Sequence, residues 1–251
     1  MNINNIDFMI AVQIDHPDRM RNLRICLTYL NKIGVKNIYL KEYYIEKSLT
    51  ECLKKEFKFN LITEKNNLDN FPRMKAINEI FKETKNDFVI IYDTDIILAK
   101  SSLENTVKLL SENADVVYPY DGHFYDIPKD TVDQLAVTLS TPIDINKCIL
   151  FNPNSFGGST AFRRNVFIEG GMCNPNFKNT GYDDNEILER FNKLRYRVKR
   201  APGILLHLNH FRGNTSFNYN SFTDHNQAEY AKVIRMTEDE LRKYIKTWQL
   251  I

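Results

Sequence analysis

The chain has 251 residues, of which 34 are basic and 32 acidic, and its formal net charge is +2. With 43% hydrophobic residues it can bury the core of a globular protein, and its balanced charge argues against a dedicated nucleic-acid binder. Four widely spaced cysteines favour reduced thiols in a cytoplasmic protein over a disulfide framework. We find no signal peptide and no apolar run long enough to span a membrane, so we expect no transmembrane segment.

Strand and helix patterns alternate along the first part of the chain. Strand patterns lie at 8–14, 37–40, 59–63 and 88–92, and helical patterns lie between them at 15–34, 49–57 and 70–85. Such alternation predicts an α/β fold with a doubly wound, mostly parallel central sheet and helices on both faces.

The rest of the chain is less regular. A helix at 101–111, with Ser101 or Ser102 as its N-cap, leads to a strand at 115–118, and from Asn152 the sequence is typical of loops. Thr237 and Glu240 form a capping box. The remaining expected elements are a helix at 184–194, strands at 196–199 and 204–209, and helices at 224–235 and 237–248. No repeat or linker marks a second domain, so we expect a single one.

Two aspartates, Asp93 and Asp95, follow directly on the apolar strand at 88–92. A strand without alternation is typical of burial on both faces, and carboxylates fit at its carboxyl end, where α/β sheets place ligand crevices. This D-x-D pair predicts a site for Mn²⁺ or Mg²⁺, which bind carboxylate oxygens and substrate phosphates. The alternative interpretation is a polar turn that ends the strand.

Two histidines, His207 and His210, lie three residues apart near the end of a later strand and are followed by Arg212. An imidazole added to carboxylates favours Mn²⁺ over Mg²⁺. Spacing of three does not put both rings on one face of a strand, so a turn must begin between them if both are ligands. His210 is the better candidate, and the alternative for each is a buried structural histidine.

Two further aspartates, Asp183 and Asp184, stand in the first turn of an expected helix. There the helix dipole and the free N–H groups stabilise carboxylates, which is a sufficient structural explanation. The functional alternative is a general base that accepts the proton of an attacking hydroxyl.

Two other stretches carry candidate ligand contacts. Arg73, Lys75 and Asn78 flank the apolar face of the helix before the D-x-D strand, either as a solvated helix start or as groups that recognise a diphosphate or a base. Gly157 and Gly158 let the backbone approach a ligand closely, although adjacent glycines are also common in turns.

The order of these motifs carries more information than any of them alone. FPRMKAIN, DTD, FGGSTAFRR, GYDDNE and HLNHFR occur in this order along residues 10–212. The series resembles the GT-A glycosyltransferases, specifically the β-1,4-galactosyltransferase-like group, whose layout bacterial capsule and surface-polysaccharide transferases share. The resemblance implies one GT-A domain, with a nucleotide-binding half at 1–98, an acceptor-binding half at 99–215 and C-terminal helices at 216–251.

The resemblance also implies a role for individual residues. Asp95 and His210 would bind the metal, His207 stands where the group often has a methionine ligand, and Asp184 would be the catalytic base. Asp93 would contact the nucleotide ribose or hold a metal-bound water. The donor-side residues would be Asp15, Arg19, Arg73, Asn78 and Asp93, and the acceptor-side residues Gly157, Gly158, Tyr182 and Asp183.

The implied activity is a metal-dependent, inverting transfer of a hexose or N-acetylhexosamine from a UDP-sugar to a glycan or lipid-linked glycan, in surface polysaccharide synthesis. Peripheral contact with a membrane is compatible with this activity. The group's tryptophans, which stack on sugar faces, are absent, and Asn179, Thr180 and Tyr182 stand in that neighbourhood. The identity of the acceptor therefore does not follow from the resemblance. Two alternatives are a sugar-1-phosphate nucleotidyltransferase, which would need a glycine-rich loop after the first strand, and a non-catalytic glycan-binding module, which would bind sugar without nucleotide.

Overall fold

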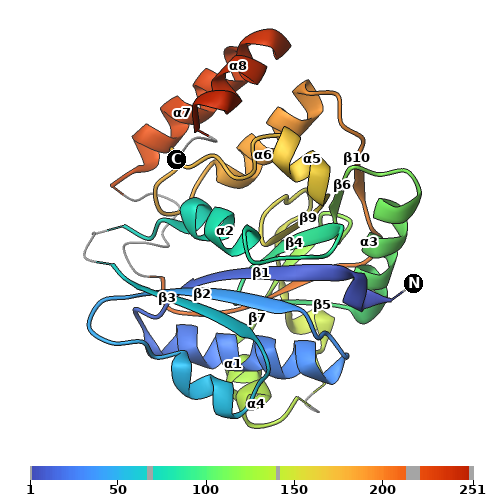
Figure 1. Ribbon diagram of the computed structural model, residues 1–251. Helices are drawn as coiled ribbons and strands as arrows, with labels where there is room; N and C mark the ends of the chain where they lie inside the picture. The colour runs from blue at the N-terminus through green and yellow to red at the C-terminus, as the bar shows by residue number, and fades with distance from the viewer. Residues whose placement is uncertain (1, 67–69, 140–141, 213–220, 249–251) are drawn as a thin grey trace.

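The computed structural model describes residues 2–66, 70–139, 142–212 and 221–248, and a seven-stranded sheet lies at the centre of this described part (Figure 1). Within the sheet β9 alone runs against its neighbours, because it pairs antiparallel with both β4 and β6 while the remaining pairs are parallel. The order of the strands is β10 (Val198–Arg200), β6 (Val116–Tyr118), β9 (Ser159–Arg163), β4 (Phe88–Tyr92), β1 (Ile6–Gln13), β2 (Ile38–Tyr44) and β3 (Asn60–Lys65).

Helices cover both faces of this sheet, as the alternation predicts. On one face the apolar core joins residues of α1 (Pro17–Lys32) and α3 (Lys100–Glu112) to residues of β1 and β2, and α3 lies against β6 and β9. On the other face the apolar core contains residues of α2 (Arg73–Phe81), α5 (Arg164–Glu169) and α6 (Asp183–Lys193). The expected mostly parallel α/β architecture is therefore confirmed, and burial of both faces explains why the strand before the D-x-D pair is apolar without alternation.

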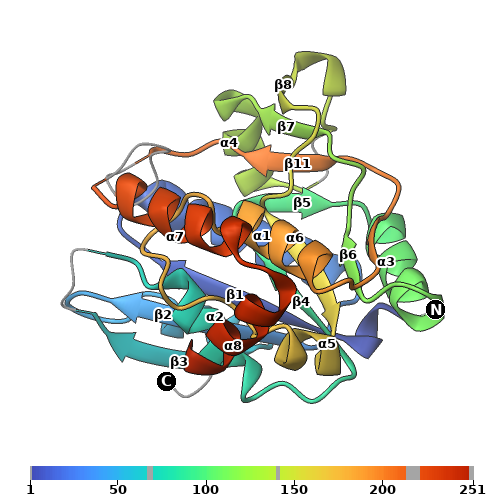
Figure 2. The same ribbon diagram turned by 90° about the horizontal axis from the view of Figure 1, so that it is seen from above.

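A second sheet lies beside the first and has the order β5 (Ile96–Leu98), β11 (Leu205–Leu208), β7 (Phe124–Ile127) and β8 (Ile149–Asn152) (Figure 2). Helix α4 (Lys129–Val137) packs against this sheet and α1. The register of β11 sets His207 opposite Ile96 on one side and Asp126 on the other. The second sheet therefore brings a residue late in the chain next to the D-x-D segment.

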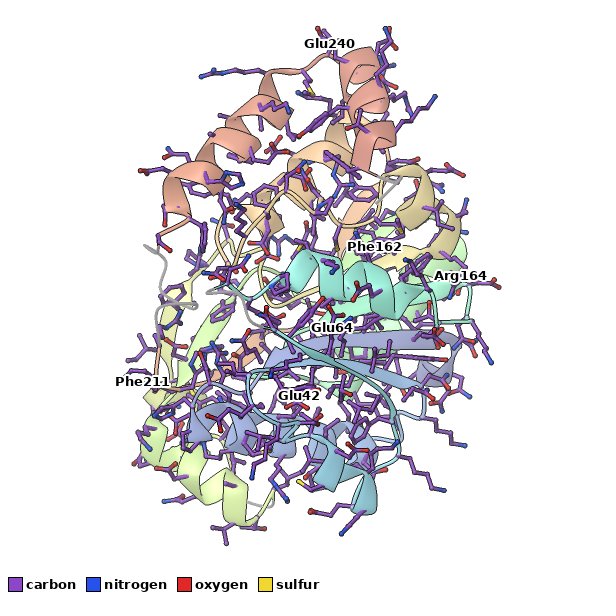
Figure 3. All side chains as sticks on the ribbon, turned by 60° about the vertical axis from the view of Figure 1, so that its left-hand side comes forward. Glu42, Glu64, Phe162, Arg164, Phe211 and Glu240 are labelled. Atoms are coloured by element: carbon purple, nitrogen blue, oxygen red, sulfur yellow. The ribbon has the colours of Figure 1, made fainter. Side chains whose placement is uncertain are left out.

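The C-terminal helices α7 (Thr223–Arg235) and α8 (Glu238–Trp248) form an outer layer that packs against α6 (Figure 1). Figure 3 shows Glu240 at the outer end of α8 and the buried Phe162 of β9 inside the molecule. The predicted capping box is confirmed, since Glu240 accepts from the Thr237 backbone N–H at 2.8 Å. In the described part of the chain, no helix combines the length and apolar character of a membrane span.

Three local expectations differ from the structure. The pattern at 49–57, expected to be an α-helix, forms a short 3-10 helix, η2 (Glu51–Lys55). Two further 3-10 helices are η1 (Ile3–Asn5) and η3 (Ile145–Lys147). The N-cap of α3 is Ala99 and not Ser101 or Ser102, so the helix start has no side-chain cap. The hydroxyl of Ser102 donates to the Pro202 carbonyl instead. The segment after Asn152, expected to be loop, contains the buried strand β9. All four cysteines are free thiols.

Candidate active site

A cavity of about 550 Å³ lies where the carboxyl ends of β1 and β4 meet. Parallel strands bring these ends to one edge of the sheet, where α/β folds hold their ligands. The sequence-predicted site residues that line the cavity are Asp15, Arg19, Arg73, Asp93, Asp95, Gly157, Gly158, Tyr182, Asp183, Asp184, His207 and His210.

Two candidate ligand contacts of α2 do not line the cavity, and these are Lys75 and Asn78. The Asn78 side-chain amide donates to the Cys173 carbonyl at 2.8 Å and accepts from the Cys173 N–H at 2.9 Å. These two bonds tie α2 to the turn after α5. The structure therefore shows a structural role for Asn78, and the donor contact expected from its motif stays a prediction.

Asp95, His207 and His210 form a cluster with the character of a metal site. One potential ligand atom from each lies within 4.8 Å of the others, and all three residues are buried. The Asp95 Oδ2 atom is 3.1 Å from His210 Nε2 and 3.9 Å from His207 Nε2. Strand β11 ends at Leu208, so the regular alternation of a strand stops between the two histidines and both rings can face Asp95.

Hydrogen bonds on the far side of each ring fix the direction of both imidazoles. His207 Nδ1 lies 2.5 Å from Asp126 Oδ1, and His210 Nδ1 lies 2.7 Å from the Phe211 carbonyl oxygen. With Nδ1–H donating to these acceptors, each Nε2 lone pair is left toward Asp95, which is how metal-binding histidines are oriented in proteins. A carboxylate and two imidazoles of this kind fit Mn²⁺.

The N-terminal turns of α1 hold the histidine segment in place. The Asn22 side chain donates to the Leu208 carbonyl at 2.7 Å, and Arg21 donates to the Asn209 carbonyl at 2.6 Å. The Leu208 N–H in turn donates to the Asp95 carbonyl at 2.7 Å. His210 is thereby fixed beside the D-x-D segment even though the two are far apart in sequence.

Arg19 of α1 supplies the positive charge inside this cluster. Its Nη1 atom is 2.8 Å from Asp95 Oδ2 and 3.3 Å from His210 Nε2. Burial raises the pKa of Asp95, but its interactions with His210, His207 and Arg19 outweigh the effect of burial and hold this pKa well below its usual range. Asp95 is therefore a carboxylate.

The first aspartate of the pair has a different set of partners. Arg73 donates from Nη2 to Asp93 Oδ1 at 2.7 Å and from Nη1 to Asp183 Oδ2 at 2.8 Å. Burial raises the pKa of Asp93, and the Arg73 charge opposes that shift. The two aspartates are therefore unequal, with Asp95 in the histidine cluster and Asp93 in an ion pair that connects β4 with the start of α6.

Asp184 lies in the first turn of α6 and keeps 32% of its side chain exposed. Loss of water contacts and the negative charge of Asp183 raise its pKa well above the usual range, although Arg73 at 3.9 Å opposes the rise. A Cβ on Gly157 would lie 2.9 Å from Asp184 Oδ2, so the absence of a side chain there makes room for this carboxylate. Tyr182, just before it, lines the cavity and stacks on Tyr230 at 5.6 Å.

The sequence did not single out some residues that belong to the site. Asp126 lies in a stretch that the sequence marks only as acidic and aromatic. Its contact with His207 depends on the pairing of β7 with β11. Arg212 was named only as a neighbour of the histidines, yet it lines the cavity. The cavity is also lined by four phenylalanines, namely Phe71, Phe124, Phe151 and Phe156.

Comparison with solved structures gives relatives at low identity that share the fold. The catalytic domain of Drosophila β1,4-galactosyltransferase 7, in complex with xylobiose, is 14% identical with a TM-score of 0.51, over 90% of this chain and 79% of that one. Mannosyltransferase PcManGT from Pyrobaculum calidifontis, in complex with GDP-Man and Mn²⁺, is 13% identical with a TM-score of 0.55, over 98% and 69%. GalNAc-T7 with UDP, GalNAc and Mn²⁺ is 13% identical with a TM-score of 0.61, over 96% and 50%.

Comparison with families points the same way. No curated protein matches the chain by sequence. The model of glycosyl transferase family 2 matches residues 44–171, which run from the end of β2 through the D-x-D pair, β9 and α5. That match covers half of the chain, and the solved relatives share its α/β fold, which is the GT-A fold. The chain therefore belongs to glycosyl transferase family 2 and is a glycosyltransferase.

Proposed function

We propose that the chain is a metal-dependent, inverting glycosyltransferase that moves a hexose or N-acetylhexosamine from a UDP-sugar to a glycan hydroxyl in surface polysaccharide synthesis. One observation carries the proposal: the Asp95, His207 and His210 cluster and the carboxyl of Asp184 line the same cavity. Transfer to a hydroxyl needs a group that stabilises the departing diphosphate and a group that accepts a proton, and this cavity offers both kinds.

On the donor side, Asp95, His207 and His210 would hold Mn²⁺ or Mg²⁺, which when bound acts as a Lewis acid toward the departing nucleoside diphosphate. Asp15, Arg19 and the Arg73–Asp93 pair would contact the nucleotide and sugar. The Mn²⁺ and nucleotide complexes of PcManGT and GalNAc-T7 support this assignment. We accordingly assign residues 1–98 to donor binding, 99–215 to acceptor binding and 216–251 to a C-terminal helical layer.

On the acceptor side, Asp184 would take the proton of the attacking hydroxyl. A carboxyl with a raised pKa is a stronger base than a free aspartate, and the Asp184 side chain is exposed to the cavity. Tyr182, held by its stacking on Tyr230, offers a flat aromatic face of the kind on which sugar rings pack. Asp183, Gly157 and Gly158 complete the acceptor side, and a glycan or lipid-linked glycan is the proposed acceptor. The xylobiose complex of β1,4-galactosyltransferase 7 supports a glycan acceptor.

The experiment that tests this function measures slow donor hydrolysis with a panel of UDP-sugars, and with GDP-mannose for comparison, in Mn²⁺. We expect hydrolysis of a UDP-hexose or UDP-N-acetylhexosamine that stops when EDTA removes the metal and returns when Mn²⁺ is added in excess. Hydrolysis of GDP-mannose alone, or hydrolysis that EDTA leaves unchanged, would contradict the proposal.

Gly157→Ala is expected to lower kcat by about tenfold or more, because a misplacement of a reacting group by about 1 Å can cost up to about 100-fold. The new methyl group would lie 2.9 Å from Asp184 Oδ2 and must push that carboxylate aside. The end of a side chain can move, so we expect the melting temperature to stay near that of the wild type. Initial rates at saturating donor and acceptor check the first expectation, and thermal unfolding checks the second.

The control for this variant is the same change in an Asp184→Asn background. If Gly157→Ala acts by displacing the carboxylate, it adds little further loss there. A full additional tenfold loss in that background would show that the glycine acts through something other than Asp184.

A further inference from the structure

The guanidinium of Arg19 uses the same atoms that the proposed metal would need. Its Nη1 atom is 2.8 Å from Asp95 Oδ2 and 3.3 Å from His210 Nε2. Those two atoms belong to the cluster in which Asp95, His207 and His210 come together. A divalent cation bound at about 2.0–2.1 Å from the Asp95 oxygen would repel a guanidinium at hydrogen-bond distance from that same oxygen. Arg19 and the metal therefore exclude each other from this position.

On the basis of the proposed function, we propose that Arg19 is the resident cation of the metal-free site. It neutralises Asp95 and keeps the cluster assembled, and it turns to the donor diphosphate when the metal enters. Arg19 is in this view a positioning residue that couples metal binding to nucleotide binding.

The surroundings of Arg19 explain why the two events would be coupled. Its side chain is only 17% exposed, so a guanidinium without a partner would be costly there. Its other ion pair in the described residues is with Asp15, one turn earlier, at 3.9 Å from Nε. Since Arg19 lines the cavity, a diphosphate in that cavity could receive two parallel N–H bonds from its guanidinium. The metal therefore displaces Arg19 at a lower cost once the diphosphate is bound.

This coupling has a measurable signature in binding alone. Mn²⁺ binds the nucleotide-free wild type weakly, and UDP raises the affinity for Mn²⁺ in two ways. Its diphosphate can coordinate the metal directly, and it can bind the Arg19 guanidinium that competes with the metal. By linkage, Mn²⁺ tightens UDP binding by the same factor. Removing the guanidinium abolishes both its competition with Mn²⁺ and the binding of the diphosphate to Arg19. The affinity for Mn²⁺ therefore rises, and the dependence of this affinity on UDP falls.

The experiment measures the dissociation constant of Mn²⁺ by calorimetry or by the EPR signal of free Mn²⁺, with and without UDP, for wild type and Arg19→Gln. We expect Arg19→Gln to bind Mn²⁺ at least tenfold more tightly than wild type without UDP. We also expect the tightening produced by UDP to shrink at least tenfold in that variant. Arg24→Gln is the matched control: it removes the same charge from the same helix at an exposed pair with Glu56, and it should bind Mn²⁺ as wild type does.

Arg19→Lys provides a second variant that keeps the charge, and we expect its Mn²⁺ affinity to lie between those of wild type and Arg19→Gln. Equal Mn²⁺ affinity of wild type and both Arg19 variants without UDP overturns the coupling, even if all three bind Mn²⁺ and UDP. Absence of Mn²⁺ binding in every variant, with or without UDP, overturns the proposed metal site and the coupling with it. An equal increase in Mn²⁺ affinity in Arg24→Gln and Arg19→Gln would show that the effect comes from net charge alone, and this result would also overturn the coupling.

Discussion

Asp184→Asn is expected to reduce glycosyl transfer by about 10²- to 10⁴-fold, which is the usual contribution of a general base. Asparagine has nearly the same shape, so it still fits beside Gly157, but it cannot accept the proton of the acceptor hydroxyl. The proposed metal ligands and donor contacts are unchanged, so calorimetry should give affinities for Mn²⁺ and UDP close to those of the wild type. Transfer at the wild-type rate would show that another group is the base.

The pH profile provides an independent check of the same assignment. In the proposed mechanism the ionised form of Asp184 is the base, and the pKa of this carboxyl is raised well above its usual range. At saturating Mn²⁺, kcat/KM of the wild type should therefore fall as the pH drops through that raised pKa, at a higher pH than an ordinary carboxyl would give. The residual rate of Asp184→Asn should lack this fall.

Arg73→Met is expected to lower the free energy of unfolding by about 3–5 kcal/mol, the cost of removing one partner from a buried ion pair. Arg73 is 8% exposed and bonds Asp93 at 2.7 Å and Asp183 at 2.8 Å, with Asp184 at 3.9 Å. Methionine fills similar volume but leaves these carboxylates without their shared counter-charge. At roughly 2–4 °C per kcal/mol for a chain of this size, the melting temperature should fall by about 6–20 °C.

Arg24→Met is the matched control, because it breaks an exposed pair with Glu56 and should cost no more than about 1 kcal/mol. Combining Arg73→Met with Asp183→Asn should recover part of the loss, because it removes one of the uncompensated charges. A melting temperature of Arg73→Met equal to that of Arg24→Met would mean that the buried pairs do not stabilise the fold as argued.

The candidate site was predictable where its residues follow directly from local pattern. The apolar run at 88–92 identifies a doubly buried strand, and only its carboxyl end can place Asp93 and Asp95 in a crevice. The first turn of α6 likewise places Asp183 and Asp184 together. In both cases the geometry depends on neighbouring residues of one element, which the sequence displays.

What the sequence missed depends on pairing across long separations. Strand β9 follows two glycines and has Ala161 at its centre, and both residue types are depleted in strands, so its local preference for a strand is weak and pairing with β4 and β6 decides it. Asp126 becomes a partner of His207 only through the register of β7 with β11. Asn78 has the residue type of a ligand contact, and nothing local indicates that its amide bonds to Cys173.

The outer helical layer provides an optical probe of the proposed acceptor side. Trp248 is the chain's one tryptophan, and its indole N–H donates to the Gly171 carbonyl at 2.9 Å. Its ring lies 5.7 Å from the Arg190 guanidinium, which is paired with Glu186 on the helix that begins at Asp183. Any movement of that helix changes the surroundings of a single indole, so intrinsic fluorescence reports on the helix that carries Asp184 without an added label.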